Sequence, residues 1–193
     1  MVYNLAKIVC SFVIMLLFRV QVTGAENFPV NGPVIVYSNH KSMWDPVLIG
    51  CILKRPVFFM AKQELFKNPF LGLLLRSINA FPVNRDMADR KAIRKCLKIL
   101  AEDKVLGIFP EGKRSKTGEL LEPEPGIALI AVKSRNAKLV PIAIKGGYGW
   151  FSKINVVIGK PIKTDTSDGK MNSKSLKDFS MQIFKEVANM MSH

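Results

Sequence analysis

The chain has 193 residues, of which 48% are hydrophobic, and a formal net charge of +14 at pH 7. This length suits one domain with a sizeable core, and the hydrophobic content excludes general disorder. The positive charge favours polyanionic partners such as nucleic acid, anionic lipid headgroups, phosphorylated metabolites or an acidic carrier protein. The three cysteines have no metal-binding or redox spacing, which indicates buried thiols in a reducing compartment: Cys10, Cys51 and Cys96.

The first predicted element is a hydrophobic, membrane-associating helix within residues 1–24. Its apolar run, Ile8–Phe18, is flanked by Lys7 and Arg19. As a helix this run spans about 16 Å, roughly half of the ~30 Å hydrocarbon core of a bilayer. Arg19 lies between the run and a weak small-residue cleavage signal, which argues against a signal peptide. The run therefore predicts an interfacial or shallowly inserted anchor, with a buried core helix as the alternative.

From Pro33 onward, short apolar runs alternate with helical patterns. The predicted strands are Val34–Ser38, Val57–Ala61, Ala80–Val83, Val105–Phe109, Leu139–Ile144 and Ile154–Ile158. The predicted helices are Pro46–Leu53, Pro69–Ile78, Arg90–Ala101, Ile127–Arg135 and a final amphipathic helix around residues 176–190. This alternation predicts an α/β fold, with one domain over residues 25–193 and a mostly parallel or mixed central sheet flanked by helices.

Polar groups follow several of the predicted strands. His40 comes after the first strand, Arg85 after the third and the Glu111–Ser115 turn after the fourth. Ligands of α/β sheets gather where strands end and loops begin. If these strands are parallel, the three groups lie on one rim of the sheet.

His40 is the first candidate for acid–base chemistry, because the only other histidine is the C-terminal residue. An imidazole titrates near neutral pH, so it can accept a proton from a hydroxyl and return it later. Asp45 lies five positions on, and a nearby carboxylate fixes the tautomer and steadies the imidazolium. A second interpretation assigns Asp45 and Pro46 to a helix start, with the aspartate as cap and the proline at the first position.

Several cations are candidates for binding an anion. Gly112 permits a tight turn that presents backbone amides, while Lys113 and Arg114 add positive charge. Lys62 and Arg85 follow strands and are further candidates for phosphate contacts. Each also has a simpler interpretation, as a solvated surface cation or as the ion-pair partner of a nearby carboxylate.

Four short segments stand out in order along the chain. They are Asn39-His40 with Asp45, Phe81–Arg85, Phe109–Ser115 and Val140–Ile142. Together they resemble the signature blocks of the glycerolipid acyltransferase family, most closely those of its bacterial 1-acyl-sn-glycerol-3-phosphate acyltransferases. The resemblance covers Pro33 to about Ile162. Lys113 stands where the family usually has threonine, and Asn79 where a glycine is common.

The resemblance implies an enzyme that moves a fatty acyl group from a thioester to the sn-2 hydroxyl of 1-acyl-sn-glycerol 3-phosphate, making phosphatidate in phospholipid synthesis. It makes His40 the general base and Asp45 the residue that orients it. The substrate-binding residues that it implies are Lys62, Arg85, Glu111, Gly112 and Arg114, to which we add Lys113 for its charge. No metal and no cofactor is implied, since the acyl donor is a substrate, either an acyl-carrier-protein or a coenzyme A thioester.

The expected partners are therefore anionic membrane lipid, lysophosphatidate and acyl-acyl carrier protein or acyl-CoA, with no nucleic acid. The expected location is the cytoplasmic face of the cell membrane, peripheral or shallowly inserted through the N-terminal helix. The alternatives are acylation of glycerol 3-phosphate or another lysolipid, a basic nucleic-acid-binding protein, and a catalytically silent membrane scaffold. A basic helix face either docks an acidic carrier protein or is solvated: Arg90, Lys91, Arg94, Lys95 and Lys98.

Overall fold

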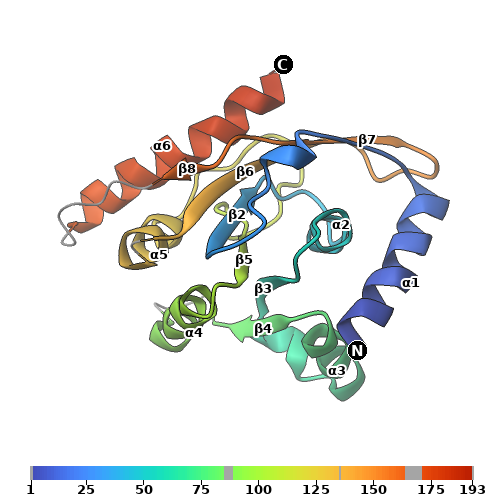
Figure 1. Cartoon of the computed structure of the whole chain (residues 1–193), viewed down its shortest axis with the longest axis horizontal. Helices are drawn as coiled ribbons and strands as arrows, with labels where there is room; N and C mark the ends of the chain where they lie inside the picture. The colour runs from blue at the N-terminus through green and yellow to red at the C-terminus, as the bar shows by residue number, and fades with distance from the viewer. Residues whose placement is uncertain (1, 85–88, 135, 164–170, 193) are drawn as a thin grey trace.

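The computed structural model describes residues 2–84, 89–134, 136–163 and 171–192. Within them, eight strands form one sheet in the order β1-β7-β6-β2-β5-β3-β4, with β8 paired to β6 (Figure 1). The strands are β1 Arg19–Thr23, β2 Val34–Ser38, β3 Val57–Lys62, β4 Ala80–Val83, β5 Val105–Ile108, β6 Lys138–Gly146, β7 Lys153–Ile158 and β8 Ile162–Lys163.

Helices cover both faces of this sheet. They are α1 Val2–Leu17, α2 Asp45–Ile52, α3 Pro69–Ser77, α4 Arg90–Ala101, α5 Gly126–Ser134 and α6 Ser173–Ser192, with short 3-10 turns η1 Ala25–Asn27 and η2 Gln63–Phe66. Side chains of α4, α5 and α6 form one buried core against the sheet, and those of α1 and α2 form the other. Figure 1 shows these two groups of helices on opposite sides of the strands. The α/β fold predicted from the alternating pattern is therefore confirmed.

The sheet is mixed. Strands β2, β3, β4 and β5 are parallel to their neighbours, and β6 is parallel to β2, whereas β7 runs antiparallel to β6. The central strand β2 is buried along its whole length, which is why its sequence is a continuous apolar run rather than an alternating one. The carboxyl ends of β2, β3, β4 and β5 consequently meet at one rim of the sheet.

The N-terminal segment differs from its prediction at its second half. Helix α1 ends at Leu17, and Arg19–Thr23 form strand β1, which pairs in parallel with β7. The segment predicted as helix within residues 1–24 is thus helical only as far as Leu17, and the sheet already begins at Arg19. Among the helices that the structure describes, none has the length and apolar character required to cross a membrane.

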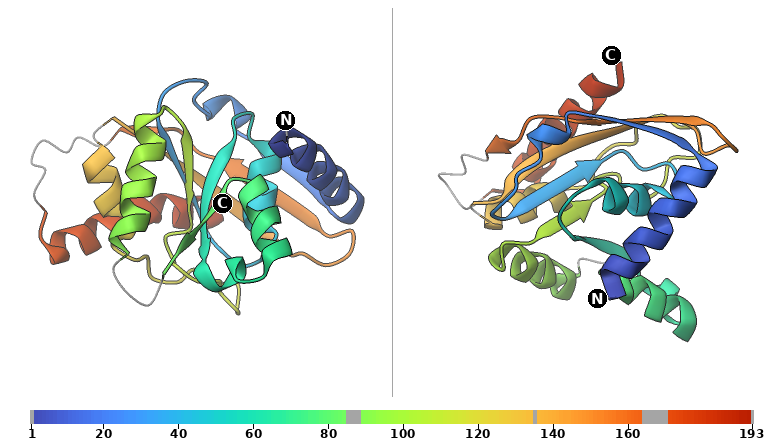
Figure 2. Two further views of the ribbon diagram at one scale, coloured as in Figure 1. Left: turned by 90° about the horizontal axis from the view of Figure 1, so that it is seen from below. Right: turned by 45° about the vertical axis from the view of Figure 1, so that its right-hand side comes forward.

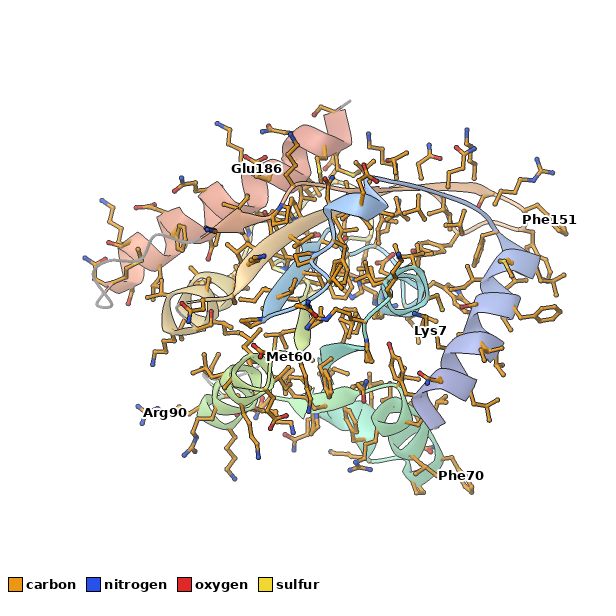
Figure 3. All side chains as sticks on the ribbon, in the orientation of Figure 1. Lys7, Met60, Phe70, Arg90, Phe151 and Glu186 are labelled. Atoms are coloured by element: carbon orange, nitrogen blue, oxygen red, sulfur yellow. The ribbon has the colours of Figure 1, made fainter. Side chains whose placement is uncertain are left out.

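Helix α1 lies along the outside of the molecule. It contacts α2 along one side, and its first turns lie beside α3 (Figure 2, right). Lys7 points from α1 toward α2, where its ammonium donates a hydrogen bond to the carbonyl of Leu53 (Figure 3). Ile14 and Phe18 are buried in the core, so the end of the helix is fixed by packing.

Candidate active site

His40 and Asp45 are in direct contact at the carboxyl end of β2. The Nδ1 atom of His40 lies 2.8 Å from Oδ2 of Asp45. The same carboxylate oxygen accepts hydrogen bonds from the backbone amides of Lys41 and Ser42, each at 2.7 Å. Asp45 therefore organises the turn into α2 and orients the imidazole at the same time, so the two interpretations of the sequence describe one group.

His40 is held by three contacts, two to its ring and one to its backbone carbonyl. Its Nδ1 faces Asp45, and its ring stacks on Phe109 with centroids 4.0 Å apart and planes 19° from parallel. Its carbonyl accepts a hydrogen bond from the Ser115 amide at 2.8 Å. The side chain of Asp45 is wholly buried, whereas His40 retains 9% exposure and lines a cavity. With Nδ1 used by the carboxylate, Nε2 is the ring nitrogen available to a substrate.

Glu111 binds the backbone of the loop that carries His40. Its Oε1 accepts a hydrogen bond from the backbone amide of His40 at 2.7 Å, and its Oε2 accepts one from Leu121 at 3.0 Å. Burial raises the pKa of this carboxyl, and the two amide bonds oppose that shift. The neighbouring Gly112 has φ +66, a left-handed conformation that glycine adopts without strain. Glu111 thus fixes the backbone at His40, Gly112 turns the loop after β5, and neither residue lines the cavity.

The predicted cations divide into three groups. Lys62 and Arg114 line the same cavity as His40. Lys113 is exposed next to Arg114 and is not part of the lining. Arg85 lies outside the residues that the structure describes. The ammonium of Lys62 is 3.6 Å from a carboxylate oxygen of Glu64, and both side chains are about half exposed, so this ion pair is weak.

The cavity behind His40 is apolar and has a volume of about 300 Å³. Its walls come from α1, α2, β3, η2 and α3, and its lining also includes His40, Lys62 and Arg114. Four residues of α1, spaced on one helical face, form part of the wall: Tyr3, Ala6, Lys7 and Cys10. This role was not predicted, because the apolar run indicates an anchor or a buried core helix and carries no signal for what its inner face contacts.

Tyr148, in the turn between β6 and β7, was also not predicted from the sequence. Its hydroxyl donates a hydrogen bond to Oδ1 of Asp45 at 2.6 Å. Asn39 also joins this part of β6 to the dyad, since its side chain exchanges hydrogen bonds with the backbone of Ile144 at 2.8 and 3.0 Å. Tyr148 lies in a glycine-containing turn, and no spacing pattern connects it with His40.

A family model described as Acyltransferase matches residues 19–145. The chain is 35% identical over 149 residues to the 1-acyl-sn-glycerol-3-phosphate acyltransferase of Bacillus subtilis, covering 74% of this chain and 73% of that protein. It is 32% identical to the Streptococcus pneumoniae protein of the same name, covering 77% of this chain and 57% of that one. For the Borreliella burgdorferi protein of that name, the identity is 29% and the two shares are 70% and 54%.

A solved structure has the same fold. It is the 1-acyl-sn-glycerophosphate (LPA) acyltransferase, PlsC, from Thermotoga maritima, with a TM-score of 0.72 and 24% identity. The match covers 99% of this chain and 81% of that one. With the family model spanning most of the chain and the Bacillus subtilis relative aligned over most of both sequences, the chain belongs to the acyltransferase family.

Proposed function

We propose that the protein transfers a fatty acyl group from a thioester to the sn-2 hydroxyl of 1-acyl-sn-glycerol 3-phosphate and so makes phosphatidate. The observation that carries this proposal is the buried contact of His40 with Asp45, together with the place of His40 in the lining of an apolar cavity. The names of the relatives support the same reaction. The chemistry requires a base, an anion site and room for a hydrocarbon chain, and the site has groups suited to each.

The proposed reaction proceeds without a covalent enzyme intermediate. The acceptor hydroxyl gives its proton to Nε2 of His40 as its oxygen attacks the thioester carbonyl carbon. Asp45 stabilises the imidazolium that forms. The tetrahedral intermediate collapses, the carbon–sulfur bond breaks, and the leaving thiolate takes the proton back from His40. No step of this sequence requires a metal or a cofactor.

The acceptor phosphate is assigned to two cations that line the cavity. Lys62 ends β3 and Arg114 lies in the loop after β5, yet both line the cavity that His40 lines. Arg can bind two phosphate oxygens at once, whereas Lys acts as a point charge. We assign Arg85 and Lys113 to the same phosphate by family resemblance and by charge respectively. This arrangement leaves the apolar part of the cavity for an acyl chain.

The proposed location is the cytoplasmic face of the membrane, with α1 lying at the lipid interface. The outer face of α1 carries large exposed apolar side chains, of which Phe12 is 64% exposed. Phe70 of α3 and Phe151 beyond β6 project at the two ends of α1 (Figure 3). Such a one-sided apolar helix on a basic protein suits an anionic lipid surface. The exposed apolar residues of α1 are Leu5, Ile8, Val9, Phe12, Met15 and Leu16.

The proposed function is tested with purified protein on anionic vesicles, using acyl-carrier-protein and coenzyme A thioesters against lysophosphatidate and glycerol 3-phosphate. We expect thioester consumption with lysophosphatidate. His40→Ala should reduce the rate by at least about a thousandfold, since a general base at the reacting hydroxyl is lost. Circular dichroism should show an unchanged fold. Turnover retained in His40→Ala would exclude His40 as the base. Turnover with glycerol 3-phosphate alone would show that the acceptor is glycerol 3-phosphate and not lysophosphatidate.

A further inference from the structure

Both carboxylate oxygens of Asp45 accept hydrogen bonds, and the donors come from different parts of the chain. Oδ2 accepts hydrogen bonds from His40 and from two backbone amides of the same loop. Oδ1 accepts a hydrogen bond from the hydroxyl of Tyr148, 103 positions away in the chain, at 2.6 Å. A carboxylate with no exposed surface depends on such bonds, because an unpaired buried charge is costly. Tyr148 thus binds Oδ1, the carboxylate oxygen that the loop of residues 40–42 does not contact.

The ring of Tyr148 is itself held in place. It packs edge-on against Phe18, with centroids 5.3 Å apart and planes at 87°. Phe18 also packs edge-on against Trp44, which precedes Asp45, at 5.8 Å. Phe18 is buried and follows directly after α1. The hydroxyl therefore reaches Asp45 from a ring whose orientation is set by aromatic packing.

The hydroxyl of Tyr148 stays protonated near neutral pH and is the donor of this hydrogen bond. Burial, followed by the nearby Asp45 carboxylate, raises the pKa of Tyr148 well above its ordinary value. Phenolate is therefore not formed near neutrality, and the bond always runs from tyrosine to carboxylate.

Other titratable groups also face the dyad. Glu111 contacts the backbone of His40, and the ammonium of Lys41 bonds to the carbonyl of Gly146. Lys62 and Arg114 line the cavity that His40 also lines. Substituting Tyr148 alone leaves these charges in place, so a comparison of the variant with the unmodified protein isolates the tyrosine hydroxyl.

We propose that Tyr148 is a positioning residue for the dyad. Its hydroxyl keeps Oδ1 of Asp45 in place so that Oδ2 stays on Nδ1 of His40. It also draws negative charge from the carboxylate, which weakens the attraction between Asp45 and the imidazolium. The inference rests on the proposed role of His40 as base, and it adds a residue outside the motif segments.

The first test is Tyr148→Phe, which keeps the ring against Phe18 and removes the hydroxyl alone. We expect kcat to fall about tenfold with little change in KM, because Tyr148 does not line the cavity. The acidic limb of the pH profile of kcat/KM should move to higher pH, since a carboxylate without the donor holds the imidazolium more strongly. A kcat and a pH profile both equal to those of the unmodified protein would overturn the proposal.

A matched control is Tyr37→Phe. Tyr37 is buried in the core on the other face of the sheet, and its hydroxyl has no hydrogen-bond partner among the described residues. Its removal should leave the pH profile unchanged. If both variants shift the profile alike, the effect is a general response of the core and the proposed role of Tyr148 is wrong.

A second measurement separates this inference from the proposed function. The chain contains two histidines, so the ring protons of His40 can be followed by NMR and assigned with His40→Ala. We expect the midpoint of the His40 titration to be higher in Tyr148→Phe than in the unmodified protein. An unchanged midpoint would overturn the role of Tyr148 even if acyl transfer is observed. A raised midpoint in a protein with no acyl transfer would uphold the contact and reject the proposed function.

Discussion

Asp45 Oδ2 accepts three hydrogen bonds at once, two from backbone amides of the loop and one from the ring of His40. The backbone bonds fix the loop between β2 and α2 in the conformation that brings the imidazole to the carboxylate. Five residues on a regular helix would place these side chains on different faces. The loop is therefore what makes the spacing of His40 and Asp45 productive.

At the residue scale, the cysteines should differ sharply in reactivity. Cys96 has no exposed surface, and burial raises its pKa to about 12. At pH 8 the thiolate fraction is then about one in ten thousand, so this thiol should react only in unfolded protein. Cys10 and Cys51 line the cavity and are partly exposed, so they should be alkylated in the folded state. Burial raises the pKa of the Cys51 thiol, so Cys51 should react more slowly than an exposed cysteine.

Mass spectrometry of protein treated with iodoacetamide, with and without guanidinium, checks this prediction. A long-chain fatty acyl ligand should slow labelling of Cys10 and Cys51 if it occupies the cavity that they line. Labelling of Cys96 in native protein at the same rate as the other two would show that the core around it opens readily.

At the element scale, stacked aromatic rings connect the pairing of β5 with β3 to the active site. Gly107 of β5 lies opposite Phe59 of β3. Phe59 stacks on Phe109 with centroids 5.8 Å apart, and Phe109 stacks on His40. Gly107 leaves the space that the ring of Phe59 occupies, because a Cβ at this position would lie 2.2 Å from the ring.

Gly107→Ala should therefore destabilise the protein by about 1–3 kcal/mol, since the ring of Phe59 must leave its present position. Urea unfolding measures this loss. Adding Phe59→Leu should recover part of it, because the two residues are in contact. Gly50→Ala serves as the control: a Cβ there meets only the Tyr3 hydroxyl at 3.8 Å, so we expect stabilisation of about 0.5–1 kcal/mol. Equal effects at both glycines would contradict the argument.

Helix α1 combines two functions on opposite faces. Its inner face closes the apolar cavity with Tyr3, Ala6, Lys7 and Cys10. Its outer face carries the exposed apolar side chains from Leu5 to Leu16 that we assign to the lipid interface. If α1 lies at the lipid interface as proposed, only the width of this helix separates the membrane from the cavity assigned to the acyl chain.

At the scale of the whole molecule, the net charge of +14 and the apolar face of α1 should act together on anionic vesicles. Phe12→Asp places a charge in the proposed interface and should weaken vesicle binding roughly tenfold or more. The control Met181→Asp changes an exposed apolar residue of α6, on the other side of the sheet from α1 (Figure 1).

Vesicle sedimentation at several salt concentrations measures both variants. Binding of the unmodified protein should decrease as salt rises, because screening reduces the attraction between basic residues and lipid headgroups. If Met181→Asp weakens binding as much as Phe12→Asp does, the interface is not centred on α1.

Much of the fold follows from local pattern. The predicted helix Arg90–Ala101 matches α4, and all six predicted strands are present. Strand β1 was missed because Arg19–Thr23 is short, mostly exposed and polar at alternate positions, directly after an apolar helix. Its strand character comes from pairing with β7. The paired residues Arg19 and Lys153 are 134 positions apart, so this pairing leaves no local signal in the sequence.

The sequence by itself determined the α/β class and the segments that carry His40, Asp45, Lys62 and Arg114, because apolar period and motif spacing are local properties. Tertiary structure alone decided that Lys62 and Arg114 share one cavity with His40, that α1 forms a wall of that cavity, and that Tyr148 completes the contacts of Asp45. These contacts join residues from separate elements. They depend on strand order and on packing in three dimensions, which a linear pattern does not specify.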